Sequence, residues 1–123
     1  FLLASTLELI VAQRLVRKIC QNCRVGRVVS RAFGEPDVTL YTGRGCISCG
    51  GTGYKGRIGL FELIPLSKDL RAAILHHPSA AEIWDVAQKG GTSSLFEDGL
   101  EKVKSGITTM DELLRVARPV EKL

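Results

Sequence analysis

The sequence predicts an α+β fold, in which a small tetracysteine lobe with short strands is followed by a compact lobe of short helices. Three observations support this prediction. Two Cys-x-x-Cys pairs lie in the first half of the chain, and a run rich in β-branched and aromatic residues follows them. Four helix-start signals are then spaced through the second half.

The N-terminal segment is expected to be an amphipathic helix that ends at Ile19. Ser5-Thr6-Leu7-Glu8 fits a capping box, and at about 100° per residue an apolar stripe forms along one face. The stripe consists of Val11, Ala12, Leu15, Val16 and Ile19. The opposite, basic face includes Arg14 and Arg17, and its ordinary interpretation is a solvated surface. The functional interpretation is contact with a nucleotide phosphate, an acidic partner or a neighbouring subunit.

Four cysteines form two pairs of identical spacing, Cys20 with Cys23 and Cys46 with Cys49, separated by 22 residues. Each pair offers two thiolates from one tight turn, and the intervening loop lets the two turns face each other. The pattern therefore predicts one structural zinc ion with four sulfur ligands. The alternative is two disulfides or four unrelated thiols, and disulfides require an oxidising compartment, of which the sequence gives no sign.

The remaining elements follow from local patterns. Residues 33–37 are predicted to form a turn, 38–41 a short strand, and 54–64 a strand that enters a core and ends at Pro65. Helices are expected to open at Ser67, Ser79, Ser94 and Thr109. We expect these four helices to pack mainly on one another.

Composition is consistent with one domain or two small lobes: 123 residues, 45% of them hydrophobic, with a net charge of +4. Five basic residues lie near the cysteines, where they could offset the negative charge of a zinc–thiolate centre, so basicity is weak evidence for nucleic-acid binding.

Residues 50–56 resemble a phosphate loop in their glycine content, but the lysine precedes the glycine and a cysteine turn precedes the segment. The chain alone has no enzyme-like motif.

Several motifs agree on one family. Residues 12–20 (AQRLVRKIC), 45–62 (GCISCGGTGYKGRIGLFE) and 94–100 (SLFEDGL) resemble segments of type II secretion and type IV pilus assembly ATPases. The resemblance extends from about residue 1 to residue 117, and the middle motif is highly specific.

The resemblance implies a C-terminal fragment of a cytoplasmic hexameric motor at the inner-membrane face. Residues 1–19 would be the edge of a RecA-like ATPase domain, 20–64 the tetracysteine zinc lobe and strand, and 65–123 the helical lobe. ATP and Mg²⁺ would be bound by the parent protein only, upstream of this chain. Implied partners are the other subunits of a homohexamer and an inner-membrane platform protein.

The fragment itself is expected to be mostly monomeric and to lack a transmembrane segment or a specific nucleic-acid partner. Its first residues, 1–3, and a tail from about Pro119 are expected to be loose. Two rival interpretations are a zinc-dependent peptide-binding module like that of DnaJ-type chaperones and a zinc-ribbon nucleic-acid binder. The first pair lacks the glycine that the chaperone repeat requires, and only 6% of residues are aromatic, which disfavours the second rival.

Overall fold

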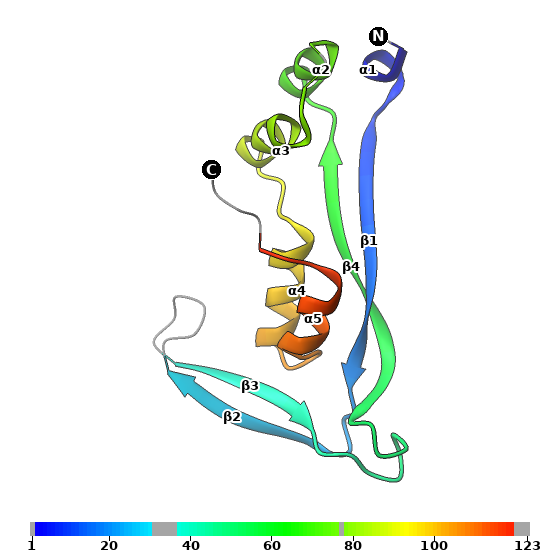
Figure 1. The fold of residues 1–123 in the computed structure, drawn as a ribbon, viewed down its shortest axis with the longest axis vertical. Coiled ribbons are helices and arrows are strands. Elements are labelled where there is room, and N and C mark those ends of the chain that lie inside the picture. The colour runs from blue at the N-terminus through cyan, green and yellow to red at the C-terminus, as the bar shows by residue number, and fades with distance from the viewer. Residues whose placement is uncertain (1, 31–36, 77, 120–123) are drawn as a thin grey trace.

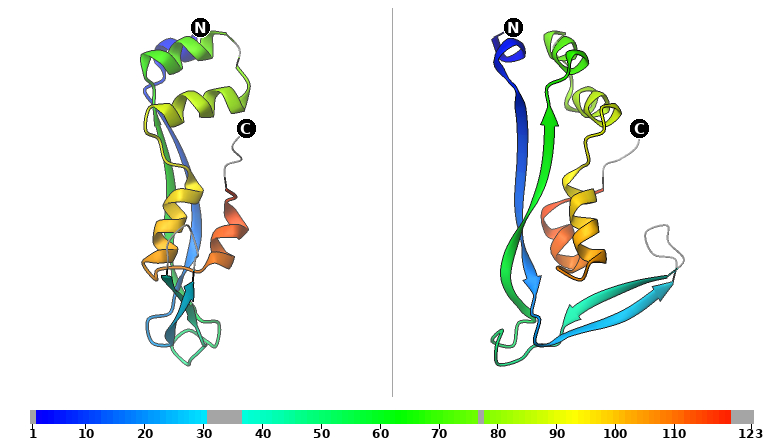
Figure 2. Two further views of the ribbon diagram at one scale, coloured as in Figure 1. Left: turned by 90° about the vertical axis from the view of Figure 1, so that its left-hand side faces the viewer. Right: turned by 180° about the vertical axis from the view of Figure 1, so that it is seen from behind.

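The computed structural model describes residues 2–30, 37–76 and 78–119, and it shows an α+β molecule built along one long antiparallel ribbon (Figure 1). The ribbon pairs β1 (Leu9–Ile19) with β4 (Tyr54–Pro65). A second antiparallel hairpin, formed by β2 (Arg24–Ser30) and β3 (Asp37–Gly43), projects sideways from one end of the ribbon (Figures 1 and 2).

Strand β1 occupies the segment for which a helix ending at Ile19 was expected, so that prediction is wrong. Within the described residues 2–19, the one helix is α1 (Leu2–Thr6). Apolar residues in β1 fit a helical period, but β1 pairs with β4 in a continuous register from Leu9 opposite Pro65 to Arg17 opposite Arg57. Neighbouring side chains of a strand alternate between faces, so the expected stripe is split: Val16 is buried, whereas Leu15 is 45% exposed.

The second half of the chain is helical, as predicted. Its helices are α2 (Lys68–Leu75), α3 (Ala80–Lys89), α4 (Leu95–Lys104) and α5 (Met110–Val116). In each, the predicted cap hydroxyl accepts a hydrogen bond from the backbone N–H three residues later. The strands expected over 38–41 and 54–64 are also present, within β3 and β4. Residues 33–36 of the predicted turn lie outside the described part of the chain.

The helices pack on the ribbon as well as on one another, which corrects the expectation of a self-contained helical lobe. One core cluster joins Val16 and Leu60 of the ribbon to Val103 of α4 and Leu113 of α5. A second cluster joins Ile64 of β4 to α2 and α3 near the other end of the ribbon (Figure 2). The ribbon therefore supplies side chains to both cores.

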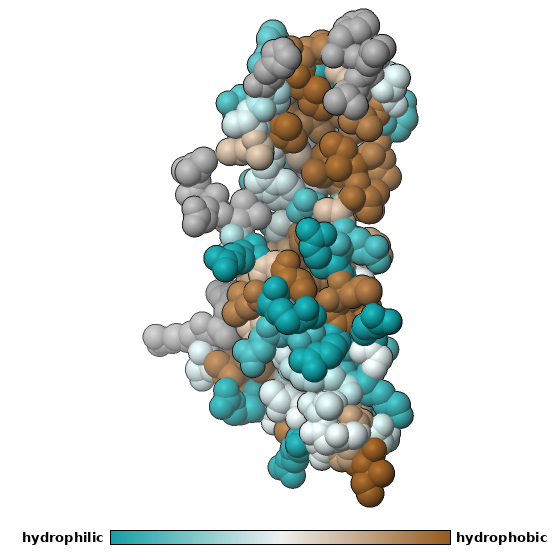
Figure 3. Space-filling view, turned by 45° about the vertical axis from the view of Figure 1, so that its right-hand side comes forward, coloured by the Kyte–Doolittle hydropathy of each residue, from teal (hydrophilic) through white to brown (hydrophobic). Residues whose placement is uncertain are grey.

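The face of the ribbon that points away from the helices is apolar and partly exposed (Figure 3). Its large side chains, between 45% and 52% exposed, are Leu9, Val11, Leu15, Phe61 and Leu63. Of the residues expected to be loose, Leu2 and Leu3 belong to α1, whereas residue 1 and residues 120–123 lie outside the described part of the chain. Among the described residues, no helix is long and apolar enough to cross a membrane.

Candidate metal centre

The four cysteines come together where the ribbon meets the second hairpin. Cys20 directly follows β1, Cys23 precedes β2, and the second pair lies in the connection between β3 and β4. All four Sγ atoms lie within 4.8 Å of one another. The Sγ–Sγ distances are 3.8 Å for Cys20–Cys46, 3.8 Å for Cys23–Cys49 and 3.7 Å for Cys46–Cys49.

These separations suit a tetrahedral metal ion. Zinc–sulfur bonds of about 2.3 Å place the corners of a tetrahedron about 3.8 Å apart. A disulfide would require about 2.05 Å between sulfurs, and all four cysteines are free. The arrangement thus matches the predicted four-sulfur site and not the two-disulfide alternative.

Backbone N–H groups donate hydrogen bonds to two of the sulfurs. Gly45 donates to Cys23 Sγ at 3.3 Å, and Cys46 and Gly53 each donate to Cys49 Sγ at 3.2 Å. Such donors stabilise thiolate charge. Of the glycines after the second pair, Gly53 is the one whose N–H reaches a sulfur, with φ of +82°.

The two thiols that receive these hydrogen bonds differ in pKa, according to whether burial or hydrogen bonding has the larger effect. Burial raises the pKa of Cys23 to about 11. Burial also acts to raise the pKa of Cys49, but the hydrogen bonds from the N–H groups of Cys46 and Gly53 outweigh it and lower that pKa to about 6. Since metal binding to a four-sulfur site requires deprotonated ligands, occupancy of this cluster would release protons.

A close approach of two backbone segments fixes the base of the lobe. A Cβ atom at Gly53 would lie 2.5 Å from the carbonyl oxygen of Gly43, so neither position has room for a side chain. The Gly53 carbonyl oxygen also accepts a hydrogen bond from the backbone N–H of Cys20, at 2.9 Å. Cysteine pairs that are far apart in sequence are thereby held against each other by backbone contacts.

The loop between α4 and α5 ties this base to the helices. The backbone N–H of Ile19 donates to the Ile107 carbonyl at 2.8 Å, and Thr108 Oγ1 donates to the Arg17 carbonyl at 2.8 Å. The hydroxyl groups of Tyr54 and Thr109 are 2.8 Å apart. The start of the cysteine lobe is therefore fastened to the helical half on both strands of the ribbon.

The two candidate arginines have different surroundings. Arg17 Nη2 lies 2.9 Å from Glu112 Oε1, its backbone N–H donates to Glu112 Oε2 at 2.8 Å, and its guanidinium lies 4.1 Å from the centre of the Tyr54 ring. Arg14 is exposed and donates to the neighbouring Gln13 carbonyl. Arg17 thus has a role in the fold, whereas Arg14 faces solvent.

Glu112 is the residue at this junction that the sequence did not single out. Its side chain is 3% exposed and also pairs with Arg115, at 3.1 Å. Burial acts to raise its pKa, but hydrogen bonds from Arg115 and Arg17 outweigh this and lower the pKa to about 2. In the sequence, Glu112 was visible only as the acidic residue of a capping box, which does not reveal a partner 95 residues away.

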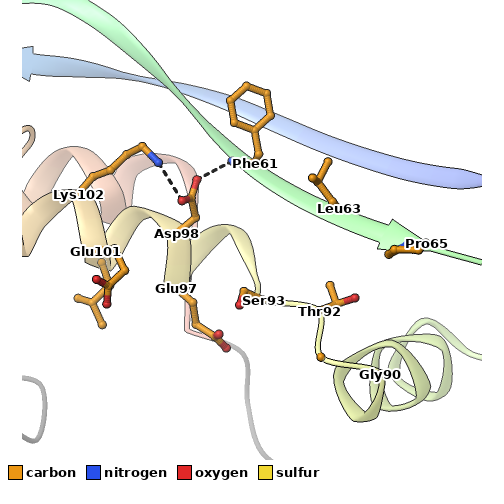
Figure 4. A pocket seen from close by; sticks show the side chains of 12 residues that line it. Phe61, Leu63, Pro65, Gly90, Thr92, Ser93, Glu97, Asp98, Glu101 and Lys102 are labelled. Atoms are coloured by element: carbon orange, nitrogen blue, oxygen red, sulfur yellow. Dashed lines mark hydrogen bonds and ion pairs between the residues drawn. The ribbon is translucent and has the colours of Figure 1, made fainter.

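A separate cavity of about 680 Å³ lies between β4, the α3–α4 connection and α4 (Figure 4). The residues that line it include Glu97, Asp98, and Phe61 and Leu63 of β4, and the side chains of the last two point away from α4 (Figure 4). Asp98 accepts the backbone N–H of Phe61 at 2.9 Å and pairs with Lys102 at 2.8 Å, so this carboxylate serves the fold. The cavity is remote from the cysteines.

Comparison with known proteins places these features in context. A family model described as "Type II/IV secretion system protein" matches residues 1–115. The "Type IV pilus assembly ATPase PilB" of Thermus thermophilus is 41% identical over 130 residues, which cover 98% of this chain and 14% of the relative. "Type II secretion system protein E" of Pectobacterium carotovorum is 40% identical over 124 residues, covering 96% of this chain and 24% of the relative.

The "Type II secretion system ATPase E" of Vibrio cholerae is 33% identical over 125 residues, covering 96% of this chain and 25% of the relative. The chain thus spans a quarter or less of the length of each of these three relatives.

Proposed function

The chain belongs to the family of type II/IV secretion system proteins, and we propose from this membership that it is the metal-holding C-terminal region of an ATPase that powers type IV pilus assembly or type II secretion. The observation that carries the proposal is the identity of about 40% over nearly the whole chain to relatives named for each of these two processes. This membership does not favour the chaperone-like or nucleic-acid-binding alternatives.

Within that ATPase, the proposed role of this chain is structural. Its sequence contains no Gly-x-x-x-x-Gly-Lys-Ser/Thr phosphate loop, so ATP and Mg²⁺ would be bound elsewhere in the longer polypeptide. By its resemblance, the whole protein would be a cytoplasmic homohexamer that works with an inner-membrane platform protein. Residues 1–19 would then border the RecA-like domain, 20–64 form the metal lobe, and 65–123 form the helical region.

A chimera tests this proposal. In the Pectobacterium relative, the 124-residue matching stretch is replaced by this chain, and secretion is measured in a strain that lacks the native gene. We expect secretion to be restored at least in part, and to be lost when Cys46→Ser is added to the chimera. A chimera that accumulates, folds and hydrolyses ATP but supports no secretion would contradict the proposed function.

We further propose that the metal is one zinc ion held by all four cysteines. An all-sulfur donor set in tetrahedral spacing favours zinc in a site without an open coordination position, so the ion would stabilise the fold and take no part in a reaction. Elemental analysis of protein purified without chelator should find one zinc per chain. Metal-free protein that is fully folded would overturn this assignment.

Two properties of the isolated chain follow from the same proposal. Isothermal titration should detect no micromolar binding of ATP, and light scattering should report mostly monomer in dilute solution. Micromolar ATP affinity, or a stable hexamer at micromolar concentration, would count against it.

Arg14 remains a proposed contact to a neighbouring subunit or a nucleotide in the longer protein. If Arg14→Ala left the ATPase rate and assembly unchanged, Arg14 would be a solvated side chain.

A further inference from the structure

Charge is distributed very unevenly along this chain. Residues 1–61 carry nine basic and three acidic side chains, whereas residues 62–123 carry eight basic and ten acidic ones. No aspartate or glutamate occurs within 9–34 or 38–61, the segments that build most of the ribbon and the cysteine lobe. The excess positive charge therefore lies at the end of the molecule that carries the cysteines, away from α2 and α3 (Figure 1).

The connection between β3 and β4 forms the extremity of that end (Figures 1 and 2). Ile47, between the cysteines of the second pair, is fully exposed. Beside it, Lys55 Nζ donates to Ser48 Oγ at 3.0 Å. Lys18 lines the same small hollow as Ser48 and Lys55. We call Ile47, Lys18 and Lys55 the basic tip.

We propose that the basic tip is a docking surface for an anionic lipid bilayer, with Ile47 entering the interface between headgroups and acyl chains while the two lysines contact lipid phosphates. An exposed aliphatic side chain beside lysines, with no acidic side chain in the neighbouring sequence, matches the chemistry of such an interface. Zinc with four thiolates would leave two negative charges at the centre, but the cluster is partly enclosed and its sulfurs face backbone N–H groups.

The shape and composition of the tip favour a bilayer over other polyanions. A protein partner typically requires about 800 Å² of complementary surface on each side, whereas this tip is a narrow projecting loop with one large apolar side chain. Single-stranded nucleic acid is usually bound by stacking on exposed aromatic rings. The two tyrosines of the lobe are already in use, since Tyr54 lies under Arg17 and Tyr41 lies under Arg24. A bilayer deforms around a convex tip and needs neither kind of complementarity.

Vesicle sedimentation tests the proposal with the chain purified without chelator. The probes are vesicles with 30 mol% phosphatidylglycerol and vesicles of phosphatidylcholine alone, each at low and at moderate salt. We expect binding to the anionic vesicles only, weakening with salt, because each basic residue near such a surface contributes roughly a fivefold change in affinity. Lys55→Glu should weaken binding about tenfold or more, and Ile47→Ser severalfold.

Two matched controls distinguish the tip from general effects. Lys68→Glu makes the same charge change on α2, near the opposite end of the molecule, and Val28→Ser removes an apolar side chain that is 65% exposed on β2. Both should bind like the unaltered chain, and circular dichroism and zinc content confirm the fold of all four variants. Absent binding, equal binding to both lipids, or equal losses in Lys55→Glu and Lys68→Glu would overturn the proposal. Unaltered binding by Ile47→Ser would exclude insertion, and tighter binding to a thymidine oligonucleotide would favour nucleic acid instead.

Discussion

The cysteine lobe and the helical half are held together by different interactions. Among the described residues of 20–53, the buried ones are Cys20, Val38 and Gly53, of which one is a proposed metal ligand and one has no side chain. In the helical half, by contrast, Leu70, Val103 and Leu113 are each 1% exposed or less and pack in two apolar clusters with the ribbon. A lobe with so little apolar burial needs another source of stability.

One short chain thus combines two modes of stabilisation. The ribbon is shared, since its strands supply Val16 and Leu60 to the helical core and continue directly into the cysteine turns. Loss of the metal should therefore affect one end of the ribbon strongly and the other end weakly. The predictions below separate these two ends.

Removing the metal should have the largest effect. A chelator or Cys46→Ser should abolish amide protection between about residues 20 and 57, because zinc binding supplies apparent free energies of about 10–16 kcal/mol in small zinc-dependent peptides. Helices α2 to α5 should stay protected. Hydrogen exchange measures both regions at once, and Ser48→Ala, in the same turn, is the control. Equal protection with and without the metal would mean that the lobe has another source of stability.

Truncating a side chain of the helical core should destabilise the helical half and leave the cysteine lobe with its metal. Leu113→Ala removes a fully buried side chain and should lower the free energy of unfolding by about 3 kcal/mol. Its neighbour Leu114 is 47% exposed, so Leu114→Ala should cost less than about 1 kcal/mol. Urea unfolding compares the two, and zinc content should be unchanged in both. A similar loss in both variants would show that the α5 side chains contribute without regard to burial.

Breaking the junction between the two regions should have a smaller effect. Glu112→Gln leaves Arg17 and Arg115 without a charged partner and should cost about 2 kcal/mol at neutral pH. Because the pKa of Glu112 is lowered to about 2 in the folded protein, its contribution is present above the ordinary carboxyl pKa and is lost as pH falls from about 4.5 toward 2. Thermal unfolding across this pH range should show a weaker acid dependence in the variant.

The control for the junction is Glu101→Gln, because the Glu101 side chain is 75% exposed and its carboxylate lies 3.9 Å from Lys104 Nζ. This substitution should leave both the stability and its acid dependence nearly unchanged. If Glu112→Gln and Glu101→Gln showed the same dependence of thermal stability on pH, the Glu112 carboxyl would not be the group whose titration changes the stability.

Removing one helix cap should give the smallest change. Ser79 Oγ accepts the backbone N–H of Glu82 at 3.2 Å, and Ser79→Ala should lower stability by about 1 kcal/mol. Ser93 is exposed and is not a cap, so Ser93→Ala should have almost no effect. Because α3 belongs to the cluster at the far end of the ribbon, neither variant should alter zinc retention.

The elements that could be predicted are those set by local chemistry. The side-chain oxygens of Ser67, Ser79, Ser94 and Thr109 form hydrogen bonds within one helical turn, so their sequence patterns are sufficient. Likewise, the spacing of the cysteine pairs was enough to predict which four thiols would meet.

The predictions that failed concern features that depend on residues far apart in the sequence. Strand β1 is stabilised by pairing with β4, 35 to 56 residues later, and nothing within its own helix-compatible pattern reveals that partner. The hydrogen-bonded ion pair between Arg17 and Glu112 was not predicted for the same reason, because its partners are 95 residues apart. Once β1 is a strand, the basic face that was expected to carry both Arg14 and Arg17 no longer exists as one surface.

The position of the cysteine cluster has a consequence for how the chain folds. Pairing Ile19 with Tyr54 requires closure of a loop of 34 residues, which carries the second hairpin. A metal that first joins Cys20 to Cys46 shortens the open segment to the few residues before Tyr54, and the entropic cost of closure falls by roughly 1 kcal/mol. Metal capture would then turn a long-range strand pairing into a nearly local one, so refolding should be faster when zinc is present from the start.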